Sequence, residues 1–205
     1  MVQKGKGWIK MVRVAQESDI GEILDIYAPY IRSTTITFEY DVPTLEVFSR
    51  RFARITEKFP WLVYEEQGKI LGYAYASAPF ERAAYSWCAE PSIYLAPEAQ
   101  GRGVGKILYE TLENLLFQMG YRVLYAIVTG ENERSLSFHK SLGYRQCGYF
   151  HNAGRKFNRW LDVYWLEKAT NSVEIPSNFP TSWPEFRNHA QSSENILGKM
   201  SLSEI

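Results

Sequence analysis

Residues 100–105 read Gln100-Gly101-Arg102-Gly103-Val104-Gly105, and this stretch decides the fold of the 205-residue chain. An alternating apolar segment, 92–95, precedes it, and an amphipathic segment, 104–119, follows it. This order predicts a strand, a glycine-rich turn and a helix. Glycines let the backbone approach a ligand closely, and the positive end of the helix dipole points at the same place. We therefore expect a pyrophosphate site here, with a plain strand-to-helix turn as the alternative.

Two other phosphate-binding loops do not fit this stretch. The dinucleotide fingerprint has a longer glycine spacing and needs an acidic residue about 20 residues further on. The loop of the NTPases needs Gly-Lys followed by Ser or Thr, and no such sequence follows here. The ligand expected at this turn is therefore of another kind.

A second motif lies downstream, where Asn132 opens a segment that ends in Leu142-Gly143-Tyr144. In this order and spacing, the two motifs resemble the two signatures of the GCN5-related N-acetyltransferase (GNAT) superfamily. The resemblance covers about 12–168 and implies acetyl-CoA as co-substrate. It implies that acetyl-CoA contacts Ile93, Tyr94, Leu95, Gln100, Gly101, Arg102, Gly103, Val104, Gly105, Lys106 and Asn132. For Asn132, a helix N-cap role is equally natural.

Four further stretches narrow the resemblance to the phosphinothricin N-acetyltransferase branch, namely 59–63, 72–76, 82–87 and 157–163. Members of this branch acetylate the α-amino group of small amino-acid analogues such as phosphinothricin or methionine sulfoximine. We expect direct transfer in a ternary complex. Neither Cys88 nor Cys147 has the surroundings that a covalent acyl-enzyme needs.

The acceptor amine must lose a proton before it attacks a thioester. The resemblance gives the general-base role to Glu90, for which a solvated charge on a strand face is the alternative. His139 would protonate the leaving thiolate or share the base role through water, because imidazole titrates near neutrality. A structural histidine is the alternative there. Backbone N–H groups at 93–95 are expected to stabilise the negative charge that develops on the thioester oxygen.

Acceptor binding is predicted for Phe38, Arg82 and Tyr85. The guanidinium of Arg82 would pair with the acceptor's carboxylate. The branch commonly carries two basic residues in this loop, whereas Pro79-Phe80-Glu81-Arg82 holds one. A less anionic or more apolar amino acid than phosphinothricin would therefore suit the aromatic surroundings better.

The hydrophobic periodicity predicts a mixed α/β (α+β) fold in the order β-α-α-β-β-β-α-β-α-β-β. The resemblance implies the GNAT fold, with one mostly antiparallel central sheet, flanking helices, and splayed fourth and fifth strands. The expected strands are 9–15, 61–64, 70–76, 85–95, 123–128, 144–151 and 158–167. The expected helices are 18–32, 44–59, 104–119 and 132–142.

Composition changes at both ends of the chain. We expect an N-terminal extension at 1–8 and an N-acetyltransferase domain at 9–169. From 170 to 205, Asn, Ser and Pro accumulate and periodicity fades, which predicts a tail that is poorly ordered or docked on the surface.

The formal net charge of zero predicts neither a nucleic-acid nor a membrane partner. No secretory signal or membrane-spanning stretch is apparent, and the two cysteines lack metal-site spacing, so we expect a cytoplasmic protein without a metal. A homodimer is compatible with the sequence. Two functional alternatives stay open: a GNAT enzyme for another amine (a polyamine, a protein N-terminus or an antibiotic), or a non-catalytic acyl-CoA-binding protein.

Overall fold

The structure is a computed structural model that describes residues 10–170, 172 and 174–192. The predicted N-terminal extension, 1–8, lies outside the described residues, as does the end of the tail from 193. The strands are β1 (Lys10–Val14), β2 (Trp61–Glu66), β3 (Lys69–Ser77), β4 (Cys88–Leu95), β5 (Val123–Thr129), β6 (Arg145–Lys156) and β7 (Arg159–Ala169). The helices are α1 (Ile20–Ser33), α2 (Leu45–Thr56), α3 (Val104–Gln118), α4 (Glu133–Ser141) and α5 (Trp183–Ser192).

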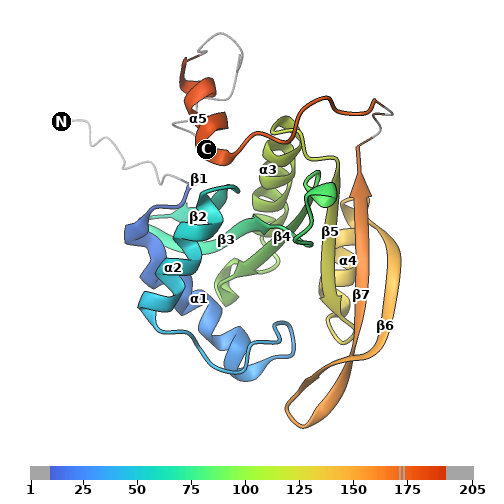
Figure 1. Ribbon diagram of the computed structural model, residues 1–205. Helices are drawn as coiled ribbons and strands as arrows, with labels where there is room; N and C mark the ends of the chain where they lie inside the picture. Colours follow the sequence, from blue (N-terminus) through green and yellow to red (C-terminus); the bar gives the residue numbers. More distant parts are fainter. Residues whose placement is uncertain (1–9, 171, 173, 193–205) are drawn as a thin grey trace, which may run out of the picture.

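One seven-stranded sheet, in the order β1-β2-β3-β4-β5-β7-β6, organises the described residues (Figure 1). Neighbouring strands are antiparallel except β4 and β5, which are parallel. The predicted mixed, mostly antiparallel fold is confirmed.

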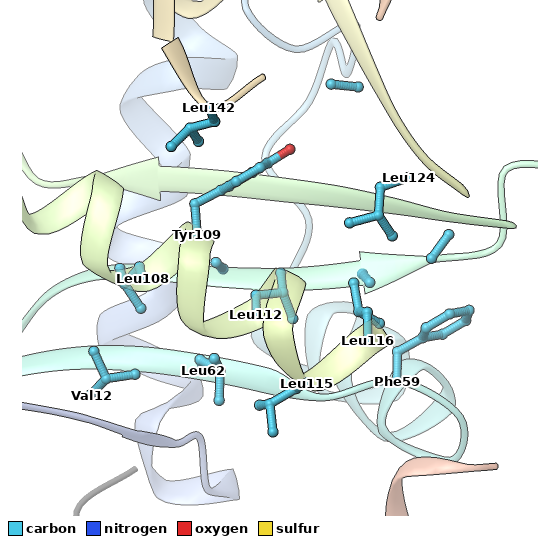
Figure 2. Packing of buried hydrophobic residues seen from close by; sticks show 14 of the residues in the cluster. Val12, Phe59, Leu62, Leu108, Tyr109, Leu112, Leu115, Leu116, Leu124 and Leu142 are labelled. Atoms are coloured by element: carbon cyan, nitrogen blue, oxygen red, sulfur yellow. The ribbon is translucent and has the colours of Figure 1, made fainter. Parts of the chain in front are cut away.

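The sheet has buried side chains on both faces, because successive residues of a strand point to opposite sides. Leu62 of β2 packs in a cluster with α3, whereas its neighbours Trp61 and Val63 pack in a second cluster with α1 and α2. Helix α3 buries an apolar stripe with helical spacing. Figure 2 shows this stripe against the strands; its members are Leu108, Leu112, Leu115 and Leu116.

The sheet opens between β4 and β5. These two strands pair only at Cys88↔Val123 and Ala89↔Leu124. Beyond that point β4 continues along β3, and β5 continues along β7. The predicted splay of the fourth and fifth strands is therefore confirmed, and among the described strands none pairs with residues 90–95 of β4 on the side of the opening.

Two predicted strand limits are wrong. The predicted strand 85–95 begins three residues too early, because Ala83–Tyr85 forms a 3-10 turn closed by local hydrogen bonds. The predicted strand 144–151 ends too early. Strand β6 runs to Lys156, and the hairpin turns at Phe157 and Asn158, both of which have positive φ.

Part of the C-terminal tail is helical. Helix α5 begins at Trp183, whose side chain is 2% exposed and belongs to the cluster packed around α3. The sequence pattern did not predict this helix, because proline and asparagine around it obscure its short apolar repeat.

Candidate active site

A groove runs along the opening between β4 and β5. Its walls come from α1, the end of β4, the glycine-rich loop and α4. The lining residues are Tyr30, Ile36, Ile93, Leu95, Gln100, Gly101, Gly103, Gly105, Lys106, Asn132, Arg134, Ser135 and Phe138. Eight of the eleven residues predicted to contact acetyl-CoA are in this set: Ile93, Leu95, Gln100, Gly101, Gly103, Gly105, Lys106 and Asn132.

The glycine-rich loop has the backbone that an anion site needs. Gly101 and Gly103 have φ of +75° and +83°, a region that side chains disfavour. Gly103 is the N-cap of α3 and supplies no capping side chain, so the first N–H groups of the helix stay available. A Cβ at Gly103 would meet no atom of the described chain within 4 Å. The residues present therefore fit a pyrophosphate group at the start of α3.

Gly103→Val is expected to raise the KM for acetyl-CoA about tenfold to a hundredfold. The branched side chain would occupy the open space and displace a group held by charge-assisted hydrogen bonds, each of which contributes about 1.5–3 kcal/mol. Gly68→Val is the matched control. Gly68 has a similar φ of +75° and the same free space, but it lies in the β2–β3 turn. Equal acetyl-CoA KM values for the two variants, measured by steady-state kinetics, would refute the loop assignment.

The side chains of three predicted contact residues point elsewhere. Arg102 donates from Nη2 to Glu66 at 2.5 Å, which fixes the loop to the end of β2. Val104 is 2% exposed and packs in the core. The ring of Tyr94 packs against those of Tyr27 and Tyr73.

The groove leads to a smaller cavity that contains both predicted catalytic residues. Its lining residues are Ile36, Glu90, Pro91, Ser92, Ile93, Tyr94, Ala126, Ile127, Val128, Asn132, Ser135 and His139. Ile36, Ile93, Asn132 and Ser135 line both spaces. The structure thus brings together Glu90 and His139, which are far apart in the sequence.

Glu90 is the first residue of β4 after its last pairing with β5, Ala89↔Leu124. The side chain is half-buried, and no described residue forms a hydrogen bond or ion pair with its carboxylate. Burial without a partner raises the pKa of this carboxyl to about 7. A carboxylate with such a pKa can accept a proton from an amine near neutral pH.

His139 is buried in α4, and both of its ring nitrogens have protein partners. Nδ1 lies 2.8 Å from the carbonyl oxygen of Ser135 and Nε2 lies 2.9 Å from the hydroxyl of Tyr109. A carbonyl only accepts, so Nδ1 donates and Nε2 accepts from the tyrosine. Burial lowers the pKa of His139 to about 4. The ring is therefore neutral at pH 7, which disfavours the predicted acid role.

Asn132 is both a helix cap and a residue of the groove. Its side-chain oxygen accepts from the backbone N–H of Ser135 at 3.1 Å, which caps α4. The same residue lines the groove and the Glu90 cavity.

Two of the predicted acceptor residues, Arg82 and Tyr85, lie in one turn, and Phe38 lies elsewhere. Arg82 is exposed at the start of the 3-10 turn, and Tyr85 is exposed next to it, with its ring centroid 4.5 Å from that of Phe80. Phe38 lies on the α1–α2 loop and fills the space beside Gly154 of β6. None of the three predicted residues is among those that line the groove or the Glu90 cavity.

The α1–α2 loop carries Ile36 to the place where groove and cavity meet, and contacts with α1, β6 and the residue Glu131 hold this loop. The hydroxyl groups of Thr37 and Tyr27 of α1 form a hydrogen bond of 2.8 Å. The carbonyl oxygen of Thr37 accepts a hydrogen bond of 2.7 Å from the ammonium group of the buried Lys156 of β6. Thr35 donates to Glu131, beyond β5, at 3.1 Å. This network fixes the wall opposite β4.

The predicted site residues did not include five residues that line the groove, namely Tyr30, Ile36, Arg134, Ser135 and Phe138. Tyr30 donates to the carbonyl of Leu95 at 2.6 Å and accepts from Gln100 at 3.3 Å. Arg134 donates a hydrogen bond of 2.6 Å to the side-chain oxygen of Gln100. Arg134 lies within the second motif and could have been found there. Tyr30 and Ile36 have no local motif, because the packing of α1 against the end of β4 brings them to the groove.

The comparison with protein families agrees with this geometry. The model of the acetyltransferase (GNAT) domain matches residues 12–165. The chain belongs to the GNAT family. It is therefore an acetyl-CoA-dependent N-acetyltransferase, and the groove and cavity form its candidate active site.

Several named relatives are phosphinothricin or methionine sulfoximine acetyltransferases. A phosphinothricin N-acetyltransferase of Alcaligenes faecalis is 37% identical, over 78% of this chain and 83% of that protein. An L-methionine sulfoximine/L-methionine sulfone acetyltransferase of Salmonella typhimurium is 29% identical, over 80% and 97%. The crystal structure of a Sinorhizobium meliloti phosphinothricin acetyltransferase in complex with AcCoA matches with a TM-score of 0.80 and 32% identity, over 87% and 98%.

Two further observations concern only the described residues. None of their helices has the length and apolarity to cross a membrane. They also contain no group of three or more His, Cys, Asp or Glu side chains that could hold a metal ion.

Proposed function

We propose that this enzyme transfers the acetyl group of acetyl-CoA to the α-amino group of a small amino-acid-like acceptor. The observation that carries the proposal is Glu90, an unpaired carboxylate with a pKa of about 7, in a cavity at the inner end of the groove. The named activities of the phosphinothricin and methionine sulfoximine relatives support this class of acceptor.

Acetyl-CoA supplies an activated acetyl thioester, which the glycine-rich loop and the groove would hold. Glu90 takes the proton from the acceptor's ammonium group and so frees the lone pair that attacks. Of the backbone N–H groups at 93–95, those that face the opening beside β4 would donate to the developing oxyanion; that of Leu95 lies 3.4 Å from the hydroxyl of Tyr30. A neutral His139 orients Tyr109 and α4 and does not itself supply a proton.

The chemistry of the two cysteines supports direct transfer of the acetyl group from acetyl-CoA to the amine. Burial raises the pKa of both the Cys88 and the Cys147 thiol, so neither is an activated nucleophile. With no thiolate to carry the acetyl group, we propose that both substrates bind together before the amine attacks.

The acceptor's side chain is proposed to be neutral. Arg82 is the only cation in the loop 78–87, and Phe80 or Glu81 occupies the place where a second cation is expected from the family resemblance. The ring of Phe80 packs on Tyr85 and on Trp165, at centroid distances of 4.5 and 5.7 Å. Such an aromatic surface favours an uncharged, polarisable side chain over a second anionic group.

Arg82→Ala is expected to weaken acceptor binding by about 1.5–3 kcal/mol, since hydrogen bonds to charged groups contribute that much. The acceptor KM should rise accordingly, with the acetyl-CoA KM unchanged. Arg50→Ala removes another exposed arginine, on α2, and is the control. An amine without a carboxylate that serves equally well as acceptor would overturn the role of Arg82.

The decisive assay measures acetyl-CoA turnover with the proteinogenic amino acids, methionine sulfoximine, methionine sulfone and phosphinothricin. Turnover is expected to be fastest with a neutral side chain. Faster turnover with polyamines, protein N-termini or antibiotics would replace the proposed acceptor, and no turnover with any amine would indicate a non-catalytic acyl-CoA-binding protein.

We also propose a cytoplasmic homodimer. Phe150 and Trp160 of the β6–β7 hairpin are 50% and 62% exposed, an apolar surface that a second copy would cover. Both cysteines are free, as expected in a reducing compartment. Light scattering in solution tests the dimer, and a monomeric mass would refute it.

A further inference from the structure

The C-terminal segment, defined here as residues 174–189, lies beyond residue 165, where the family match ends. In Figure 1 it passes from the end of β7 over α3 to α5. Its backbone is fixed at two turns of the domain. Thr181 donates to the carbonyl of Met119 at 2.8 Å, and Trp183 donates to that of Lys58 at 3.1 Å.

The contact at the α3–β5 turn depends on a glycine. Gly120 has a φ of +100°, and a Cβ at this position would lie 3.4 Å from Cα of Pro180. Three residues after Pro180, Trp183 inserts into the core. The contacts at Pro180 and at Trp183 therefore hold the middle of the segment close to the surface of the domain.

One contact of the segment reaches the loop 78–87, which carries Arg82 and is called the acceptor loop here. Phe179 stacks on Trp87, with ring centroids 5.0 Å apart and an interplanar angle of 20°. The indole N–H of Trp87 donates to the carbonyl of Asn178 at 3.2 Å. Because Phe179 is 63% exposed, its contact with Trp87 is not part of a core whose loss would unfold the protein.

Trp87 links the two parts of the proposed acceptor site. On its N-terminal side lies the 3-10 turn with Arg82 and Tyr85, and on its C-terminal side β4 begins and leads to Glu90. Its carbonyl accepts from Arg122 at 2.8 Å and from Val123 at 3.3 Å, next to the short β4–β5 pairing. A shift of Trp87 would therefore move the carboxylate-binding loop relative to the base.

We propose that the C-terminal segment positions the acceptor loop: Phe179 and Asn178 hold Trp87, and through it the turn that carries Arg82. Phe179 is a positioning residue, since it acts through Trp87. The inference rests on the proposed function for its effect on acceptor binding. The expected effect of Phe179 on the order of the acceptor loop does not depend on which acceptor is used.

The test compares Phe179→Ala with Ile175→Ala and Phe179→Tyr in the full chain. Ile175 is 94% exposed in the same segment and serves as the control. Phe179→Ala is expected to raise the acceptor KM about twofold to tenfold, the factor that a lost aromatic stack corresponds to. The acetyl-CoA KM and the thermal midpoint should stay unchanged, and Phe179→Tyr should restore the wild-type acceptor KM.

Hydrogen exchange of peptides covering 80–88 gives a second readout. The amides of Tyr85 and Ser86, which bond to Arg82 and Ala83, should exchange faster in Phe179→Ala only. Unchanged exchange in Phe179→Ala would overturn the inference, and so would an unchanged acceptor KM in an active enzyme. A wild-type protein that acetylates no amino acid overturns the proposed function instead, and the exchange comparison still decides the inference.

Discussion

Glu90→Gln is expected to lower kcat about 10²- to 10⁴-fold, the usual contribution of a positioned general base. Glutamine keeps the shape of the side chain and removes its basicity. The Kd for acetyl-CoA should not change, because Glu90 lines the inner cavity and not the groove around the glycine-rich loop. Steady-state kinetics and calorimetric titration with acetyl-CoA measure the two quantities.

The pH profile gives the same prediction a second form. Glu90 works only when ionised, and burial raises its pKa to about 7. The value of kcat/KM should therefore fall about tenfold per pH unit below pH 7 and level off above it, until the acceptor amine itself titrates. In Glu90→Gln, this acidic limb of the profile, the fall of kcat/KM below pH 7, should disappear.

Glu81→Gln and His139→Ala are the comparisons. Glu81 is exposed and its loss should leave the pH limb in place. His139→Ala should cost less activity than Glu90→Gln, since the ring is neutral at working pH and its pKa is about 4. Near-wild-type activity in Glu90→Gln together with an inactive His139→Ala would make His139 the base.

The residues that the sequence identified are those with a local signature. The glycine-rich loop was predictable because its glycines lie between an alternating apolar segment and an amphipathic segment; the positive φ of Gly101 and Gly103 is seen only in the structure. Glu90 and His139 have no such signature. Their roles follow from the family resemblance, and only the folded sheet shows that they share one cavity.

The residues that the sequence missed owe their position to packing between distant segments. Tyr30 reaches Leu95 across 65 residues of sequence. The strand limit at Tyr85 was wrong because alternating large and small residues also suit a 3-10 turn, here one whose Tyr85 ring packs on Phe80. Helix α5 did have a signal: Ser182 and Glu185 have capping-box spacing, and their side chains are 3.2 Å apart.

Trp183→Ala is expected to lower the free energy of unfolding by about 3–5 kcal/mol, the range for removing a large aromatic side chain from a core. Trp183 is 2% exposed and packs in the cluster around α3, although it lies beyond the family match and outside the predicted domain 9–169. Ile175→Ala, at a 94% exposed site in the same segment, should change stability by less than about 0.5 kcal/mol.

Urea titration distinguishes two ways in which Trp183→Ala can lower the free energy of unfolding. If the C-terminal segment unfolds together with the domain, Trp183→Ala lowers the midpoint and leaves the m-value unchanged. If the segment detaches from an otherwise native domain, the m-value falls too, because less surface remains to be exposed on unfolding. In that second case loop 80–88 should also exchange faster, since Phe179 would leave Trp87. A midpoint and an m-value both equal to those of Ile175→Ala would show that the domain is complete without the segment.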